Sequence, residues 1–116
     1  MNVLNEKTSL EEVSLFLQVL SPSARLEILL AIGTGESCVC HLEALLGYRQ
    51  AYISQHLMAL RNAELVESRR EGRYIYHRLK DPALLDFIRQ AAQLSGVDML
   101  EISTESKDCC CPNCVP

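Results

Sequence analysis

Apolar residues recur three and four positions apart through the first half of this chain, a spacing that places them on one face of a helix. The pattern predicts four helices, the first beginning at a capping motif at Ser9 and the second at Ser21. The third helix begins near residues 38–40, and the fourth begins near Gln50 after a short turn at Gly47. Two short helices joined by such a turn form a helix-turn-helix candidate.

The chain then changes to an alternating pattern, which predicts two strands at residues 65–69 and 73–79. Residues 70–72 form the turn between them, so the pair is a β-hairpin wing. A last helix with a single apolar stripe follows Asp81-Pro82. The predicted order is therefore α-α-α-α-β-β-α, a mainly α fold with a small β-hairpin, of the winged helix-turn-helix class.

The periodic pattern fades toward the C-terminus of the 116 residues, which predicts two parts. Residues 1–98 form one folded domain, and residues 99–116 form a polar, cysteine-rich tail that orders only when something binds it. The chain has no run of about 18 apolar residues, the length that predicts a membrane span. Its polar N-terminus lacks the apolar core of a signal peptide. We therefore expect a cytoplasmic chain without a membrane partner, whose thiols are kept reduced.

Charge is distributed unevenly, although the net charge of −4 taken alone argues against DNA binding. Residues 49–80 carry seven Lys and Arg against three Glu, a local charge of +4, whereas residues 1–48 and 81–116 each sum to −4. A basic segment between acidic flanks is the pattern expected where a polyanion binds. The basic segment coincides with the fourth helix and the wing.

The fourth helix has one apolar face and one face of hydrogen-bonding side chains, and the wing is rich in arginine. Glutamine can read an adenine edge in the major groove, and arginine can reach phosphates or the minor groove. The predicted DNA-binding residues are Gln50, Tyr52, Ser54, Gln55, His56, Arg69, Arg70 and Arg73. The alternatives are structural: His56 is a packed, hydrogen-bonded residue, Tyr52 covers the core, and the arginines form a solvated turn.

Two runs in this region resemble a known family. Residues 49–66, with their Ser-Gln-His-Leu core, and residues 70–76, with Glu-Gly-Arg, resemble the recognition helix and wing of ArsR/SmtB metal-sensing repressors. Residues 20–30 resemble the second helix of that family, so the likeness covers roughly residues 9–95. It implies a winged-helix homodimer formed through the first and last helices, an inverted-repeat operator in double-stranded DNA, and release of the operator when an inducer binds.

The candidate metal ligands are cysteines. The family's zinc and nickel sensors often carry Asp and His ligands on the last helix, but residues 81–90 contain no histidine, so we expect that interface site to be absent. The six cysteines instead fall into two clusters, and tight clusters in a reducing compartment favour metal thiolates or redox chemistry over disulfides. They are Cys38 and Cys40 in one cluster and Cys109, Cys110, Cys111 and Cys114 in the other.

The first cluster lies in Cys38-Val-Cys40-His-Leu42, which resembles the Cys-Val-Cys-Asp-Leu element at the start of the third helix in the family's arsenic and cadmium/lead sensors. Two cysteines at this spacing converge on one ion only where the backbone is irregular, as at a helix start. Glu43 stands where the arsenic sensors often add a third cysteine, so a local three-thiolate site is missing. About ten extended residues span up to ~33 Å, so the tail can reach the third helix of its own subunit or of its partner.

The working hypothesis is one soft ion, held by Cys38, Cys40 and one or two of the tail cysteines, that acts as the inducer of a repressor. Thiolates select soft ions over magnesium or calcium. Four sulfurs suit cadmium, lead or zinc, and three suit trivalent arsenic or lead. His41 is a further ligand candidate, with a surface residue as its alternative.

Other roles for the cysteines stay open. Cys38 and Cys40 are also explained as two small buried hydrophobes, and the tail as a metal-scavenging end without a switch role. Cys111 and Cys114 form a C-x-x-C pair, which binds metal independently or acts as a redox dithiol. The alternative function is therefore a thiol-based redox or reactive-sulfur-sensing repressor of the same fold. The sequence shows neither a glycine-rich phosphate loop nor a catalytic triad, so it does not predict an enzyme. A metallochaperone would explain the cysteine-rich tail but not the basic segment.

Overall fold

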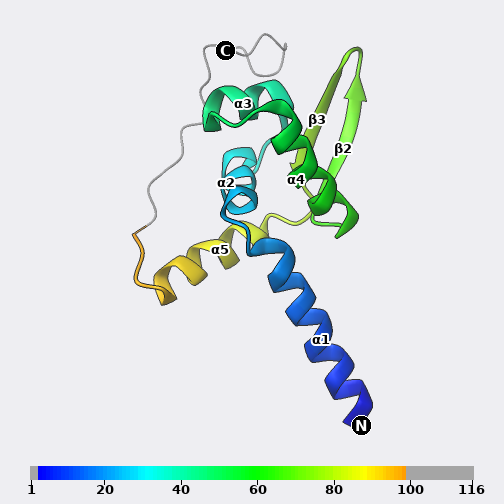
Figure 1. The fold of residues 1–116 in the computed structure, drawn as a ribbon, viewed down its shortest axis with the longest axis vertical. Coiled ribbons are helices and arrows are strands. Elements are labelled where there is room, and N and C mark those ends of the chain that lie inside the picture. The colour runs from blue at the N-terminus through cyan, green and yellow to red at the C-terminus, as the bar shows by residue number, and fades with distance from the viewer. Residues whose placement is uncertain (1–2, 99–116) are drawn as a thin grey trace.

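The computed structural model describes residues 3–98, with side chains from Ser9 onward. Over these residues, five helices and three strands follow one another along the chain (Figure 1). They are α1 (Val3–Leu20), α2 (Ser23–Ile32), β1 (Ser37–Cys38), α3 (Val39–Leu46), α4 (Gln50–Asn62), β2 (Val66–Glu71), β3 (Tyr74–Leu79) and α5 (Ala83–Leu94). This arrangement confirms the winged helix-turn-helix fold, with α3 and α4 as the helix pair and β2 with β3 as the wing.

The first two helices begin at other residues than the local motifs predicted. α1 begins at Val3 and runs through the capping motif at Ser9, because the preceding residues include Leu, Glu and Lys, which favour a helix. α2 begins at Ser23, and its N-cap is Pro22 in an extended conformation with no side-chain cap. The prediction that Ser21 caps this helix was therefore wrong.

The boundaries of the later helices agree better with the sequence pattern. α4 begins at Gln50 as expected, and Gly47 ends α3 in the left-handed region with a φ of 79°, which glycine adopts without strain. The last helix begins after Asp81-Pro82 as predicted. Pro82 is its N-cap, without a side-chain cap, and Asp81 Oδ1 accepts a hydrogen bond of 2.9 Å from the backbone N–H of Ala83. These signals are local, which is why the sequence alone located them.

A third strand, β1, was not predicted. Ser37 and Cys38 pair antiparallel with β3, opposite His77 and Tyr76 respectively, and give a sheet in the order β1-β3-β2. The expected helix start near residues 38–40 is confirmed, because α3 begins at Val39, and Cys38, which has extended backbone angles, is its N-cap. Two residues are too short to show a period of two, so only the pairing with a distant strand reveals this element.

The turn of the wing is tighter than expected. β2 and β3 pair as far as Glu71 opposite Tyr74, which leaves a two-residue turn of Gly72 and Arg73. The turn predicted at residues 70–72 was therefore wrong: it began two residues too early, ended one too early and was one residue too long. Gly72 has a φ of +62°, the positive value that short hairpin turns require.

The hydrophobic core is built around α2. This helix contacts α1, α3, α4, α5 and β3, and its residues Ile28 and Leu29 are completely buried. Figure 1 shows α2 in the middle of the molecule, between the α3–α4 pair and α5. The predicted core face of α4 is confirmed, because Ile53, Leu57 and Leu60 are all buried. The opposite face of α4 is thereby left for solvent or a partner.

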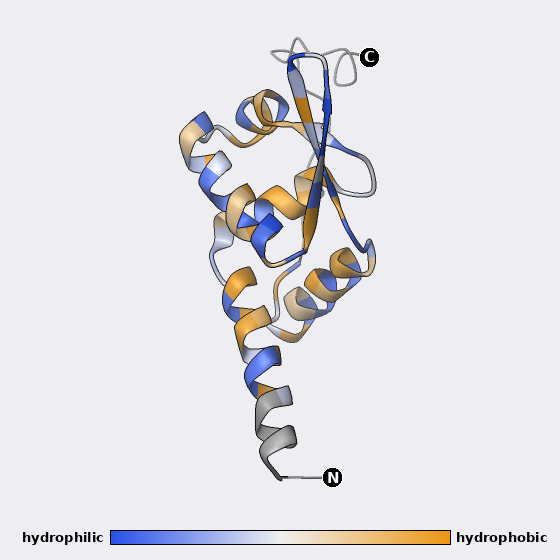
Figure 2. Ribbon diagram, turned by 90° about the vertical axis from the view of Figure 1, so that its right-hand side faces the viewer, coloured by the Kyte–Doolittle hydropathy of each residue, from blue (hydrophilic) through white to orange (hydrophobic). Residues whose placement is uncertain are grey.

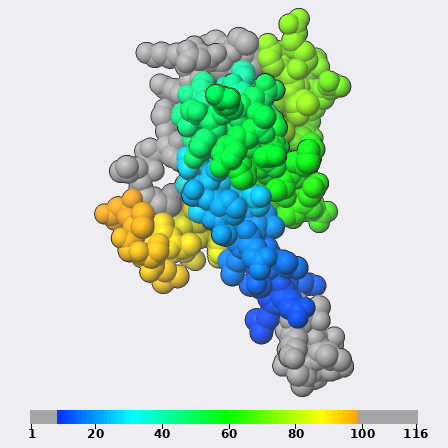
Figure 3. All heavy atoms as spheres, viewed as in Figure 1, coloured from blue at the N-terminus to red at the C-terminus, as the bar shows by residue number. Residues whose placement is uncertain are grey.

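The two ends of the described chain carry apolar residues outside this core. Figure 3 shows α1 projecting from the rest of the molecule, and Figure 2 shows hydrophobic segments along this helix. The large apolar side chains exposed on α1, on α5 and just after α5 are Leu10, Val13, Leu15, Leu17, Phe87, Leu94 and Val97. An apolar surface of this kind on a folded chain indicates a partner surface.

No single helix among residues 3–98 is both long enough and apolar enough to cross a membrane. Residues 9–20 and 23–32 reach the required length and composition only when they are taken together, and they bend by 81° where they meet. The second of these segments is α2, half of whose residues are buried in the core.

Candidate nucleic-acid interface and thiol pair

The polar face of α4 carries the residues that the sequence singled out for contact with DNA. Gln50, Tyr52 and Gln55 are exposed, and Ser54 and His56 are partly exposed, all within the first two turns of the helix. No described side chain caps the amides at this end of α4. The structure therefore brings all five predicted residues together on the outer surface of one helix.

An aromatic row stabilises this end of α4 against α2. The rings of Tyr48 and Tyr52 are 5.0 Å apart, and the rings of Tyr52 and His56 are 4.6 Å apart in an edge-to-face contact. The Tyr48 hydroxyl donates a hydrogen bond of 2.8 Å to Glu27 of α2, and this carboxylate raises the pKa of Tyr48. Tyr52 therefore packs along α4 between two aromatic neighbours rather than into the core.

His56 is held by a residue that the sequence reasoning missed. Arg25 Nε donates a hydrogen bond of 3.0 Å to His56 Nδ1. Burial and the neighbouring Arg25 lower the pKa of His56, so the ring is neutral at pH 7. His56 thus has the hydrogen bond that we expected if its role is structural. Its ring is nevertheless partly exposed beside Tyr52, where it can also contact a partner. No local signal points to Arg25, which lies 31 residues before its partner.

The three wing arginines differ in their environment. Arg69 is bound by Glu36 through two hydrogen bonds from Nε, of 2.9 and 3.1 Å, and by Glu71 at 3.3 Å. Its guanidinium also lies 4.9 Å from the centre of the Tyr76 ring. Arg70 and Arg73 are exposed, and neither forms an ion pair within the described residues.

These contacts tie Arg69 electrostatically to the residue that precedes β1. Hydrogen bonding to Arg69 lowers the pKa of Glu36 and raises the pKa of Arg69 itself. Both groups are therefore charged across the whole neutral range. Arg69 was predicted together with Arg70 and Arg73 as a phosphate contact, but of the three only Arg69 has carboxylate partners among residues 3–98.

The two cysteines of the first cluster lie side by side. Cys38 Sγ and Cys40 Sγ are 3.4 Å apart, with Cys38 buried and Cys40 partly buried. The backbone is extended at Cys38 and becomes helical at Val39, so the change from strand to helix turns both sulfurs toward one point. Tyr76 and Tyr74 pack around the pair.

The remaining candidate ligands cannot be placed around this pair. Cys109, Cys110, Cys111 and Cys114 lie outside the described residues. Within residues 3–98, no group of three or more His, Cys, Asp or Glu side chains is arranged to hold a metal ion. His41, the further candidate, is buried in the first turn of α3. Two thiolates are fewer than a stable soft-metal site uses, so residues 3–98 of one chain do not complete such a site by themselves.

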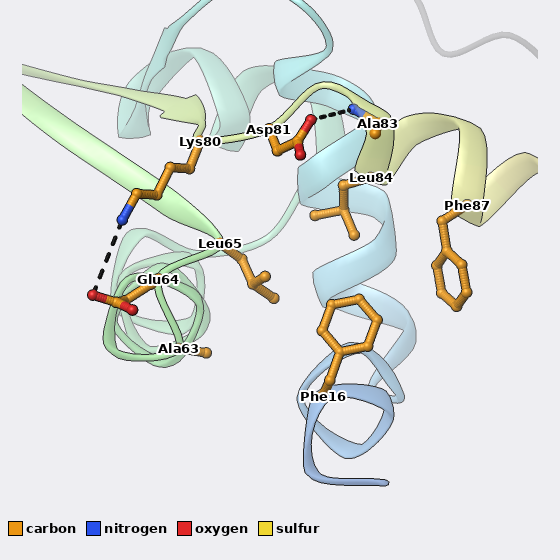
Figure 4. A pocket seen from close by; sticks show the side chains of 9 residues that line it. All are labelled: Phe16, Ala63, Glu64, Leu65, Lys80, Asp81, Ala83, Leu84 and Phe87. Carbon is orange, nitrogen blue, oxygen red and sulfur yellow. Dashed lines mark hydrogen bonds and ion pairs between the residues drawn. The ribbon is translucent and has the colours of Figure 1, made fainter. Parts of the chain in front are cut away.

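A cleft of about 730 Å³ opens on the side of the molecule that α1 and α5 form (Figure 4). Phe16 of α1 and Phe87 of α5 line it, with their ring centres 5.6 Å apart. Lys80 and Glu64 stand at its edge as an ion pair of 4.0 Å. The cleft continues the exposed apolar surface of these two helices and includes none of the predicted DNA-binding or thiol residues.

Comparison with known proteins gives consistent matches in sequence and in fold. The family described as bacterial regulatory proteins of the arsR family matches residues 22–68, from the start of α2 into β2. The arsenical resistance operon repressor of Staphylococcus aureus is 35% identical over 105 residues, which are 90% of this chain and 93% of that protein.

Among solved structures, reduced HlyU from Vibrio cholerae has a TM-score of 0.70 and 25% identity, covering 79% of this chain and 97% of its own. The transcriptional repressor BigR from Xylella fastidiosa has a TM-score of 0.68 and 29% identity, covering 81% and 96%. In both cases nearly the whole neighbour superposes on this chain.

Proposed function

The chain belongs to the ArsR family of bacterial DNA-binding regulators, which are transcription factors and not enzymes, and we propose that a thiophilic ion bound at Cys38 and Cys40 releases it from its operator. The observation that carries this proposal is the 3.4 Å distance between the two sulfurs at the junction of β1 and α3. Membership in the family supports the role as a transcriptional repressor, and the thiol pair supports a thiophilic ion as the inducer.

We assign the reading of DNA to α4 and the wing. A recognition helix inserts its N-terminal residues into the major groove, where Gln50 and Gln55 can contact adenine edges. Arg70 and Arg73 at the wing tip are exposed, and we assign them to phosphate contacts. The exposed polar face of α4 supports this assignment, because its opposite face is already used in the core.

The functional form is a homodimer through α1 and α5 that binds an inverted repeat. Both helices expose apolar side chains, among them Leu15 and Leu94, and the cleft lined by Phe16 and Phe87 lies between them. A second copy would cover this surface and place two recognition helices about a two-fold axis. A two-fold protein reads a palindromic operator, since each half-site meets the same helix.

The donor set of the thiol pair suits a soft ion. Thiolates bind trivalent arsenic, cadmium, lead and zinc in preference to hard cations. Cys38 and Cys40 would supply two sulfurs, and the tail cysteines Cys109, Cys110, Cys111 and Cys114 are the candidates for the rest. The relative named as an arsenical resistance repressor makes arsenite the first ion to test.

The position of the pair explains how binding would reach DNA. Cys38 belongs to β1, which pairs with the wing strand β3. Cys40 belongs to α3, which packs against α4. An ion that draws the two sulfurs toward further thiolates therefore pulls on the wing and on the support of the recognition helix at once, and disturbs the geometry that DNA binding requires.

A combined metal and DNA titration tests the proposal. The reduced protein is titrated with arsenite, cadmium and lead, while thiolate-to-metal absorption and binding to a duplex enriched by the protein from a randomised pool are recorded. Cys38→Ser and Cys40→Ser should keep DNA binding and lose both the absorption band and the release. The matched control replaces the four tail cysteines by serine, which separates the tail ligands from the pair. Normal ion-induced release in Cys38→Ser would overturn the assignment.

A second candidate function is redox or reactive-sulfur sensing. It rests on the same distance of 3.4 Å between Cys38 Sγ and Cys40 Sγ. Two thiols in contact can be joined as a disulfide when a peroxide or polysulfide accepts their two electrons and two protons leave. The similar structure from Vibrio cholerae is that of reduced HlyU, which makes a redox form worth testing. Release of DNA by such an oxidant, with no metal absorption band, would favour this function over ion sensing.

A further inference from the structure

One guanidinium joins three helices next to the recognition surface. Arg25 lies in α2, its Nη1 donates a hydrogen bond of 2.9 Å to the backbone carbonyl of Val19 in α1, and its Nε donates one of 3.0 Å to His56 Nδ1 in α4. The two hydrogen bonds of Arg25 thus connect α1, to which we assign the dimer interface, with His56 on the polar face of α4.

The direction of the second hydrogen bond decides where the proton of His56 sits. A guanidinium has five N–H donors and no acceptor, so Nδ1 must offer a lone pair to Arg25. A neutral imidazole carries one proton, which is then on Nε2. The ring is neutral because burial and the neighbouring charge of Arg25 lower its pKa.

We propose that Arg25 is a positioning residue for DNA recognition, because it holds His56 in the tautomer that presents Nε2–H as a donor. The two ring nitrogens point in diverging directions, so Nε2 points away from Arg25. The edge-to-face contact with Tyr52, at a ring distance of 4.6 Å and an angle of 85°, fixes the plane of the imidazole. Ring plane and proton are therefore both set before DNA arrives.

A donor at this position selects its partners. Phosphate oxygens, the N7 atoms of purines, guanine O6 and thymine O4 all accept hydrogen bonds, and each suits an N–H of His56. The other tautomer would turn a lone pair toward the same electronegative atoms and lose the contact. Arg25 thereby affects DNA affinity without needing to touch DNA.

The inference rests on the part of the proposed function that places α4 against DNA, and it is independent of the inducer. Its first test needs no DNA. Long-range proton–nitrogen NMR spectra of the ¹⁵N-labelled protein at neutral pH report the tautomer of each histidine, and the His56→Gln variant assigns the His56 signals among those of His41 and His77. We expect the Nε2–H form for His56. An Nδ1–H form or an imidazolium would overturn the proposal.

The second test compares Arg25 variants. Arg25→Met removes the donor and should give a mixture of His56 tautomers and a DNA affinity lower by about tenfold, the value of one good polar contact. Arg25→Lys keeps a donor at the end of a long side chain and should restore most of the Nε2–H form and most of the affinity. The salt dependence of binding should stay at the wild-type slope in both variants, because His56 is neutral and Arg25 does not touch DNA, so no cation is removed from a phosphate.

A double variant separates positioning from loss of the fold. Once His56 is replaced by Gln, Arg25→Met should cost little further affinity, since its effect passes through the imidazole. Equal losses in both backgrounds, or wild-type affinity in Arg25→Met, would overturn the proposal. Failure of the wild-type protein to bind any duplex would instead contradict the proposed function and leave the NMR test of the tautomer intact.

Discussion

Cys38 lies directly opposite Tyr76 where β1 pairs with β3, so a residue of the thiol pair is also part of the wing sheet. On the other side of β3, Tyr76 is opposite Arg69 of β2, and the Arg69 guanidinium lies over the Tyr76 ring. The carboxylate of Glu36, the residue just before β1, accepts a hydrogen bond from Arg69. A continuous set of contacts therefore links the thiol pair to the wing.

We predict that Glu36→Gln weakens the coupling between ion and DNA. The number of ions bound should be unchanged, since Glu36 is not a thiolate ligand. The factor by which the ion lowers DNA affinity should fall about two- to fivefold, in keeping with an exposed ion pair. Glu67→Gln is the matched control, because it removes a wing carboxylate whose ion pair with Arg78 joins β2 to β3 and does not involve the bond between Glu36 and Arg69. Equal effects in both variants would contradict the link.

The wing arginines should differ in their effect on salt dependence. Arg70→Ala and Arg73→Ala should each reduce the slope of log affinity against log salt concentration by roughly 0.9, as expected for the loss of one phosphate contact. Arg69→Ala should leave this slope unchanged, because its guanidinium is bound by Glu36 and Glu71. Fluorescence anisotropy at several salt concentrations measures all three. A reduced slope for Arg69→Ala would show that this residue also reaches a phosphate.

Mild acid should destabilise the protein through His77. Burial and, to a smaller degree, Arg61 lower the pKa of this residue, whose Nδ1 lies 2.8 Å from Ser68 Oγ. Between the lowered folded pKa and the unfolded value of about 6.5, the unfolded chain binds more protons, so stability rises with pH. The contribution is complete above about pH 6.5 and is lost as the pH falls through the folded pKa.

Urea unfolding at one fixed protein concentration, repeated at several pH values, measures this effect. Within the stated window the free energy of unfolding should change by up to about 1.4 kcal/mol for each pH unit. His77→Gln should remove this part of the pH dependence and leave the contribution of the carboxylates. A difference between wild type and variant that does not change with pH would refute the assignment to His77.

Leu94→Glu should abolish the dimer while leaving the subunit folded. Leu94 is 91% exposed near the end of α5, so the charge costs little within one chain but opposes burial of this helix against a second copy. Sedimentation velocity should show a monomer, and affinity for the inverted repeat should fall more than about tenfold, because two linked half-sites are no longer bound together. Ile75→Glu, at an exposed apolar residue of the wing strand β3, is the control and should remain dimeric.

The sequence by itself determined the elements whose signal is local. Apolar periodicity located α4 and its buried face, including Ile53 and Leu57, and the alternating pattern located the wing. Gly47 and Asp81 marked helix boundaries because their effects act within a few residues. The same local pattern carried the likeness to the ArsR family, since the recognition helix and wing are continuous in the chain.

The tertiary structure decided what depends on residues distant in the chain. β1 exists because residues 37–38 meet a strand that begins at Tyr74, and two residues alone show no period. Arg69 and His56 were predicted alike as DNA contacts, but their partners lie 33 and 31 residues away, at Glu36 and Arg25. Side-chain hydrogen bonds across such separations form only after the core has packed, and no pattern of neighbouring residues encodes them.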